Sequence, residues 1–137
     1  MKKIKLPAEI ERIEEATEFV SEILDSTGCP EKIKMQMSIA LDELMSNVAR
    51  YAYAPETGEI TLIVDVLEKP KRMVLTLTDS GKPYNPLEKE DPDTTLSAEE
   101  RGIGGYGIFI VKKVMDNVTY EYKAGHNVLT MQKNFTK

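Results

Sequence analysis

Two polar side chains, Glu43 and Asn47, are the first candidates for chemistry in this sequence. Apolar residues around them recur at three- and four-residue steps, which predicts a helix. Because Glu43 and Asn47 are four residues apart, they share one face of that helix. An amide oxygen suits Mg²⁺, which keeps waters and phosphate oxygens as its other ligands. A neighbouring carboxylate can accept a proton from an attacking hydroxyl or water. Glu and Asn at this spacing are also common on solvated helices, so the pair alone leaves both explanations open.

A second candidate, Asp79-Ser80-Gly81, ends a predicted strand. Asp79 continues an alternating apolar row through Leu75 and Leu77, which places its carboxylate at the sheet edge or in a pocket. In a pocket it can accept a hydrogen bond from an adenine amino group, and Gly81 lets the backbone pass close to the base. The alternative is a plain turn, because Asp-Ser-Gly is good turn chemistry.

The third candidate is a glycine cluster, Gly104-Gly105-Tyr106-Gly107, directly before the apolar run 108–111. Glycines at the start of a helix expose backbone N–H groups without bulk, which favours phosphate. No Gly-Lys-Ser/Thr follows, so this is not a Walker A loop, and no strand precedes it, as a dinucleotide fingerprint requires. A flexible hinge before a core helix is the ordinary alternative.

Hydrophobic periodicity predicts the elements that must position these candidates. Alternation predicts strands at residues 2–6, 59–67 and 73–79, and a closing hairpin of 118–123 and 127–134 around Gly125. Three- and four-residue steps predict helices from residue 7 to a stop at Gly28, from residue 30 to before Pro55, and from after Gly107 to about residue 115. This order predicts an α+β two-layer sandwich, with helices covering one face of a mixed sheet.

Size and charge narrow the classes of protein. The 137 residues fit one domain spanning 1–137, and the net charge of −5 without a basic stripe argues against a direct nucleic-acid ligand. No apolar run is long enough to cross a bilayer and no signal peptide is evident, so we expect no membrane contact. The single cysteine, Cys29, excludes an intrachain disulfide, is expected to be a buried or idle thiol, and fits a cytoplasmic location.

In their order and spacing the three motifs resemble the ATP pocket of the GHKL superfamily, which includes histidine kinases and gyrase. Residues 43–47 resemble its N box, 79–81 its first glycine box and 104–107 its second. Within it, the stretches 79–86 and 104–116 resemble the small anti-sigma factor serine kinases of bacteria. The resemblance covers about residues 30–134. It implies a Bergerat ATP-binding fold, with an ATP lid at about residues 80–103.

The resemblance also implies a role for each candidate residue. Asn47 would hold Mg²⁺, Glu43 would be the general base for a serine hydroxyl, and Asp79 would bind adenine. The other residues expected around the nucleotide are Gly81, Arg101, Gly104, Gly105, Gly107 and Thr130. Among these, Arg101 would approach the γ-phosphate or contact a partner, and Thr130 would join the adenine network. Three residues depart from frequent family types: Tyr51 for histidine, Asn85 for aspartate and Tyr106 for leucine.

The implied activity is an ATP-dependent serine kinase that phosphorylates a STAS-type antagonist and regulates transcription by partner switching. A sigma factor is an implied second partner, and a homodimer is compatible with the resemblance. Two other functions fit the same motifs: a nucleotide-dependent protein-binding module with little or no transfer, and a slow ATPase without a protein acceptor. The lone histidine, His126, lies near the final turn, where we expect a surface role, which disfavours a sensor histidine kinase.

Overall fold

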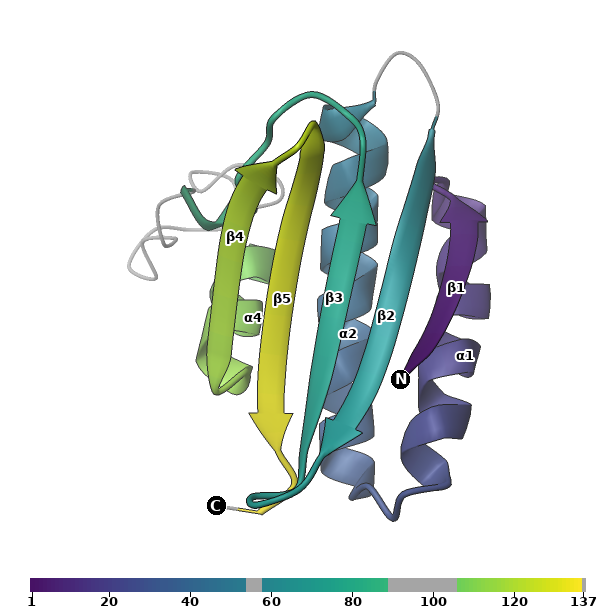
Figure 1. Cartoon of the computed structure of the whole chain (residues 1–137), viewed down its shortest axis with the longest axis vertical. Coiled ribbons are helices and arrows are strands. Elements are labelled where there is room, and N and C mark those ends of the chain that lie inside the picture. Colours follow the sequence, from purple (N-terminus) through teal and green to yellow (C-terminus); the bar gives the residue numbers. More distant parts are fainter. Residues whose placement is uncertain (54–57, 89–105, 137) are drawn as a thin grey trace.

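Five strands in one sheet and a layer of helices make up the part of the chain that the computed structural model describes, residues 1–53, 58–88 and 106–136 (Figure 1). The strands are β1 (Lys2–Pro7), β2 (Glu59–Leu67), β3 (Arg72–Asp79), β4 (Asn117–Lys123) and β5 (His126–Asn134). Their order across the sheet is β1-β2-β3-β5-β4. The last strand in the sequence therefore lies inside the sheet, between β3 and β4.

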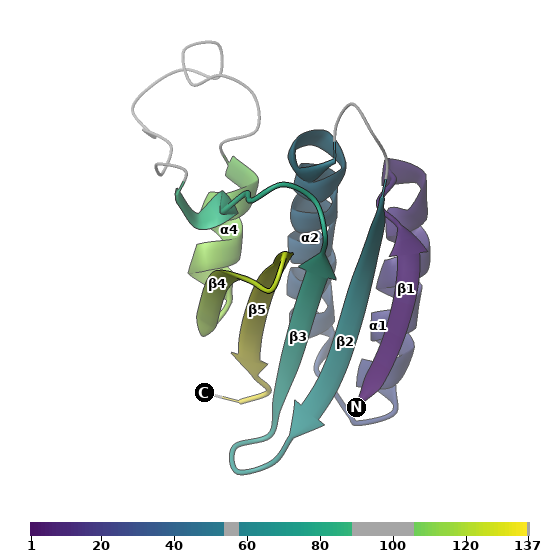
Figure 2. The ribbon, with the colours of Figure 1, turned by 45° about the horizontal axis from the view of Figure 1, so that its top comes forward.

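The α-helices cover one face of this sheet, while no described residue forms a layer over the other (Figures 1 and 2). They are α1 (Ile13–Asp25), α2 (Glu31–Asn47) and α4 (Tyr106–Val114), and α2 continues into a π-helical turn, Val48–Ala52. Short 3-10 turns occur at Ile10–Arg12 and Pro86–Glu88. None of the described helices is long and apolar enough to cross a membrane.

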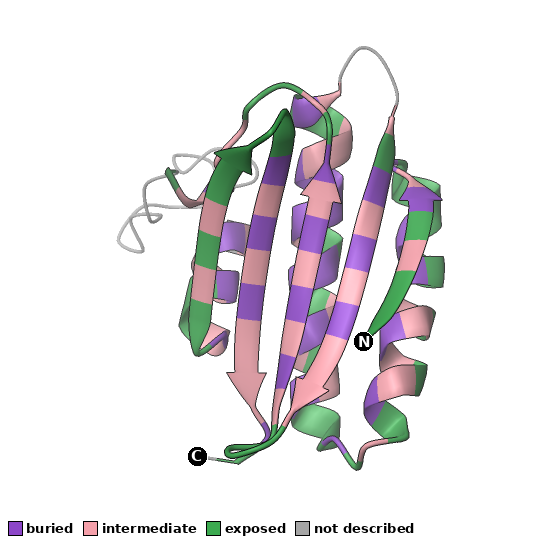
Figure 3. Ribbon diagram, viewed as in Figure 1, coloured by how far each residue is buried: buried purple, intermediate pink, exposed green. Residues whose placement is uncertain are grey.

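Side chains that are buried at alternate strand positions pack between the sheet and the helices. Along β3, every second residue from Met73 to Asp79 is buried, and β2 shows the same alternation from Ile60 to Val64 (Figure 3). The buried face of α2 supplies the middle of the core, with Met37 and Leu41 fully buried. The apolar side chains that alternate along the strands and those that recur along the helix therefore face the same core.

Local turn chemistry sets the ends of two elements. Beyond the end of α1, Gly28 has a φ of 78°, a left-handed conformation that glycine adopts without steric cost. The β4–β5 hairpin turns through Ala124 and Gly125, at φ values of 54° and 80°. Both observations agree with the sequence predictions of a helix stop at Gly28 and a hairpin around Gly125.

The two-layer α+β sandwich is confirmed, but the expectation of a mixed sheet is wrong for the described strands. All four pairings, β1–β2, β2–β3, β3–β5 and β5–β4, are antiparallel. Strands β3 and β4 do run in the same direction (Figure 1). Because β5 lies between them, these two parallel strands are never neighbours. Sequence periodicity predicts strands, but it contains no information about their order.

Candidate nucleotide site

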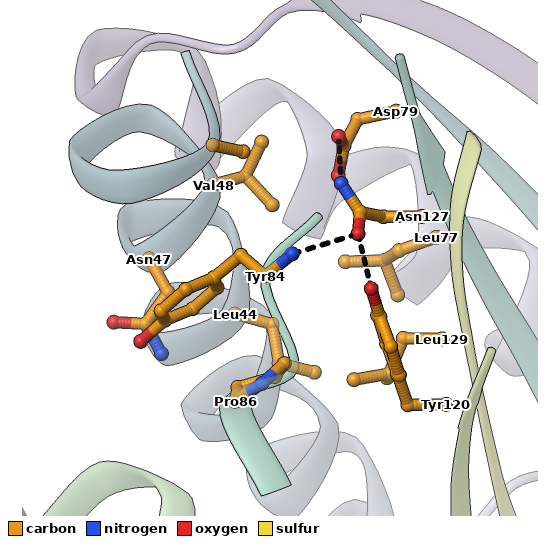
Figure 4. A pocket seen from close by; sticks show the side chains of 11 residues that line it. Leu44, Asn47, Val48, Leu77, Asp79, Tyr84, Pro86, Tyr120, Asn127 and Leu129 are labelled. Atoms are coloured by element: carbon orange, nitrogen blue, oxygen red, sulfur yellow. Dashed lines mark hydrogen bonds between the residues drawn. The ribbon is translucent and has the colours of Figure 1, made fainter. Parts of the chain in front are cut away.

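A pocket opens at the end of the sandwich where α2 and β3 finish and β5 begins (Figure 4). Its walls are mostly apolar, with a few polar groups, which is typical of a small-molecule site. The lining residues are Leu44, Asn47, Val48, Ala52, Leu77, Asp79, Tyr84, Pro86, Tyr120, Asn127 and Leu129. Two of the predicted site residues therefore line the same pocket from different layers: Asn47 from the helices and Asp79 from the sheet.

The predicted pair on α2 is joined by a hydrogen bond. Asn47 is 3% exposed, and its Nδ2 donates to Glu43 Oε1 over 3.3 Å. With the nitrogen turned to Glu43, the amide oxygen is left on the other edge of the group. A neutral amide oxygen is a donor that fits Mg²⁺, which takes its remaining ligands from phosphate and water. The π-helical turn begins directly after Asn47, and such turns are frequent at functional sites.

Gly107, in the first turn of α4, lies against the same carboxyl group. A β-carbon at Gly107 would lie 2.0 Å from both Cδ and Oε2 of Glu43. Glycine is thus the residue that lets the start of α4 lie directly beside this carboxylate. The structure brings together Glu43, Asn47 and Gly107, as the sequence predicts.

Asp79 closes the far side of the pocket. It is 6% exposed, and its Oδ1 accepts hydrogen bonds from Asn127 Nδ2 at 2.8 Å and from the Gly81 backbone N–H at 2.9 Å. Burial raises the pKa of the Asp79 carboxyl above its ordinary value, while these two hydrogen bonds and the nearby His126 oppose the shift. Both hydrogen bonds end on Oδ1, and within residues 1–53, 58–88 and 106–136 no hydrogen bond ends on Oδ2.

Gly81 is required for a close backbone approach beside Asp79. A β-carbon there would lie 2.5 Å from the backbone oxygen of Ala52, the last residue of the π-helical turn. The next residue, Lys82, donates its backbone N–H to the same oxygen over 3.0 Å. The segment that leaves β3 is thus fixed to the end of α2, and this contact forms one rim of the pocket.

Sequence reasoning missed Asn127, the buried polar residue on which Asp79 depends. Asn127 is 5% exposed, and its side chain contacts Asp79, Lys82, Tyr84 and Tyr120 through hydrogen bonds. A signal was present in the sequence: Asn127 begins an alternating apolar row in β5, just as Asp79 ends one in β3. The two residues are register partners in the sheet.

Thr130, predicted to join the adenine network, does not line the pocket. It lies between the buried residues Leu129 and Met131 of β5, so its side chain points to the uncovered face of the sheet. Its register partners are Thr76 and Thr119. The expectation is therefore corrected: β5 contributes Asn127, three residues earlier, because strand alternation excludes Thr130 from the helix side.

Tyr51, one of the departures from the family pattern, stacks on Tyr84 of the pocket wall, with ring centroids 5.1 Å apart. Other expected residues cannot be placed. Arg101, Gly104 and Gly105 lie outside the described residues, as does the expected lid from residue 89 to 103. Their predicted roles remain predictions.

Comparison with known proteins shows the family to which this sequence is similar. Residues 6–133 match the family described as histidine kinase-like ATPase domain. The chain is 27% identical over 131 residues to serine-protein kinase RsbW of Listeria monocytogenes, covering 92% of this chain and 82% of that protein. It is 26% identical over 101 residues to serine/threonine-protein kinase BtrW of Bordetella bronchiseptica, covering 73% and 70% of the two chains.

Solved structures show the same fold at lower identity. The RsbU and RsbW domains of Rv1364c from Mycobacterium tuberculosis superpose with a TM-score of 0.67 at 13% identity, covering 98% of this chain and 32% of that one. A histidine kinase domain from Erythrobacter litoralis gives 0.58 at 11% identity, covering 96% and 62%. Since the family match extends over residues 6–133, with the pocket inside it, the chain belongs to the histidine kinase-like ATPase domain family.

Proposed function

We propose that this protein is a Mg-ATP-dependent serine kinase that phosphorylates a STAS-type antagonist and regulates transcription by partner switching. The family supports ATP as the nucleotide, and the similar RsbW and BtrW proteins are named as serine or serine/threonine kinases. A sigma factor as second partner, a homodimer and a cytoplasmic location belong to the same proposal.

One observation carries the proposal: Glu43, Asn47 and Gly107 meet at one point beside the pocket. The Asn47–Glu43 hydrogen bond joins the metal-ligand candidate to the base candidate. Gly107, in the first turn of α4, lies against the Glu43 carboxyl group, and the start of a helix offers backbone N–H groups that favour phosphate. Phosphoryl transfer requires mainly positioning and charge neutralisation, and these are the groups that would supply both.

In the proposed reaction, bound Mg-ATP supplies the γ-phosphoryl group and its leaving group. The serine oxygen of the acceptor protein forms a bond to the γ-phosphorus, and the bond from that phosphorus to the β–γ bridging oxygen breaks, releasing ADP. Glu43 accepts the hydroxyl proton. Asn47 would hold the metal through its amide oxygen and, through Nδ2, keep the Glu43 carboxylate in place. Asp79 would bind the base at the far side of the pocket.

The first experiment is calorimetric titration of the wild-type chain and Asn47→Ala with ATP, with and without Mg²⁺. We expect magnesium-dependent binding by the wild type and weaker, less magnesium-dependent binding by the variant. If the wild type does not bind Mg-ATP, the kinase proposal is wrong and a partner-binding scaffold becomes the better description.

The second experiment measures transfer of labelled γ-phosphate to STAS-domain proteins of the source organism. Glu43→Gln should bind Mg-ATP normally and transfer at least about 100-fold more slowly, the usual range for loss of a general base. Asp42→Asn is the matched control, since Asp42 is the exposed neighbouring acid on α2. A wild type that binds Mg-ATP but phosphorylates no candidate would instead support the nucleotide-dependent binding module.

A further inference from the structure

Asn127 uses every hydrogen-bonding group of its side chain on other parts of this protein. An asparagine amide has two N–H donors and an oxygen with two lone pairs. Nδ2 donates to Asp79 Oδ1 at 2.8 Å and to the Lys82 backbone oxygen at 2.9 Å. Oδ1 accepts from the Tyr84 backbone N–H at 3.0 Å and from the Tyr120 hydroxyl (Figure 4). With no donor or acceptor left over, Asn127 has no group to offer a ligand directly.

The four bonds converge from separate segments. Asp79 is the last residue of β3, Lys82 and Tyr84 belong to the segment that leaves it, and Tyr120 is on β4. A hydroxyl side chain has a single donor, so a serine or threonine here would bond Asp79 or Lys82, but not both. The amide at this position therefore fixes the base-side carboxylate and the adjoining pocket wall to one point on β5.

The effect on Asp79 is to engage one of its two carboxylate oxygens. Asn127 and the Gly81 N–H both donate to Oδ1, which leaves Oδ2 as an acceptor for a ligand. An ionised carboxylate oxygen pairs with an amino group and is left unpaired by a carbonyl oxygen. Sites built around such a buried polar group reject analogues that lack the matching donor.

Building on the nucleotide-binding function proposed above, we propose that Asn127 is a positioning residue that sets base specificity, by holding Asp79 so that the pocket selects a 6-aminopurine over a 6-oxopurine. The residue acts through Asp79 and touches no ligand. Its loss should weaken the interaction made by the amino group and leave the other contacts of the nucleotide in place.

The test compares the affinities of Mg-ATP and Mg-inosine triphosphate, which carries a carbonyl oxygen in place of the amino group. We expect the wild type to favour ATP, and Asn127→Ala to reduce the ratio of the two affinities about tenfold or more, mostly through weaker ATP binding. Thr130→Ala is the matched control, because Thr130 is on the same strand and points to the opposite face. It should leave the ratio unchanged.

If Asn127 had a purely structural role, its loss would weaken the binding of both nucleotides by the same factor. An unchanged ratio of the two affinities in folded Asn127→Ala would therefore overturn this inference, but not the proposed nucleotide binding. If Asn127→Ala does not fold, Asn127→Ser, which retains one donor, replaces it with the same expected direction. A wild type that binds neither nucleotide would overturn both the nucleotide function and this inference. A wild type that binds both equally well would contradict the inference while leaving nucleotide binding intact.

Discussion

The α-carbon of Gly107 lies so close to the Glu43 carboxyl group that a β-carbon would come within 2.0 Å of Cδ and Oε2. The group it would displace is the flexible end of a side chain, so Gly107→Ala should fold, with Glu43 turned away. We expect phosphoryl transfer to fall at least about 100-fold. Unfolding free energy should stay equal or rise by up to about 1 kcal/mol, because alanine favours a helix over glycine.

Urea denaturation and the rate of transfer from labelled ATP measure the two effects of Gly107→Ala separately. The double variant Glu43→Gln, Gly107→Ala should be no slower than Glu43→Gln, since both changes act through one carboxylate. Wild-type transfer by Gly107→Ala would show that this contact has no role in the reaction.

Gly81→Ala, unlike Gly107→Ala, should reduce the stability of the fold. Its β-carbon would meet the backbone oxygen of Ala52 at 2.5 Å, and a backbone segment yields less readily than the end of a side chain. We expect a loss of about 1–3 kcal/mol in unfolding free energy, together with weaker Mg-ATP binding.

Gly28→Ala is the control for Gly81→Ala. No atom lies within 4 Å of the position its β-carbon would take, and only the left-handed φ of 78° opposes the substitution. It should destabilise the fold and leave nucleotide affinity unchanged. Equal stability of Gly81→Ala and wild type in urea would contradict the predicted clash.

Asp79→Asn should separate stability from binding. The folded pKa of Asp79 is raised above its ordinary value of 3.8 by burial, so the native state binds this proton more tightly than the unfolded chain. The contribution of Asp79 to stability is therefore present at low pH and is lost as the pH rises from 3.8 through the raised pKa. Above that range, Asp79→Asn should be at least as stable as wild type, because an amide oxygen can still accept both hydrogen bonds.

Urea denaturation from pH 4 to pH 7.5 measures this difference, and ATP titration measures the cost. The unfolding free energy of the Asp79→Asn variant should decrease less with rising pH than that of the wild type. ATP should bind to the variant at least about tenfold more weakly, because a charged acceptor is gone. Identical pH profiles for the two proteins would show that Asp79 titrates as it does in the unfolded chain.

Cys29 should be a slow nucleophile. The residue is 8% exposed, and burial is the main cause that raises the pKa of its thiol, with Lys34 opposing the shift. The thiolate is the reactive form, so a disulfide reagent at pH 7.5 should react more slowly with the native protein than with glutathione. In urea the rate should rise to that of an ordinary thiol. Equal rates in the native and unfolded states would contradict this prediction.

Hydrophobic periodicity predicts the helices and strands of this fold well, because an element buried on one face has apolar residues at regular intervals in the sequence. The alternation that ends in Asp79 and the helical steps around Glu43 and Asn47 are present in the sequence itself. The strand order is not, since the insertion of β5 between β3 and β4 depends on tertiary pairing. The expectation of a mixed sheet was wrong for that reason.

The site shows the same limit on a smaller scale. Motif spacing predicts Glu43 and Asp79 as site residues, whereas Thr130 is predicted from the family resemblance, which does not take into account the face of the strand on which it lies. Counting alternate positions back from Met131 leads through Leu129 to Asn127. The four hydrogen bonds of Asn127 join segments up to 48 residues apart, which no local pattern could indicate.

The interior position of β5 has a consequence for how the chain folds during synthesis. Until residues 126–134 leave the ribosome, β3 has an open edge and β4 has no partner in the described sheet. The hairpin can form locally, but its docking against β3 closes a long loop and should be slow. Because Asn127 is on that same strand, the nascent chain completes the proposed nucleotide pocket in the step that docks β5 against β3, and any chaperone that shields the edge of β3 would also delay the proposed nucleotide binding.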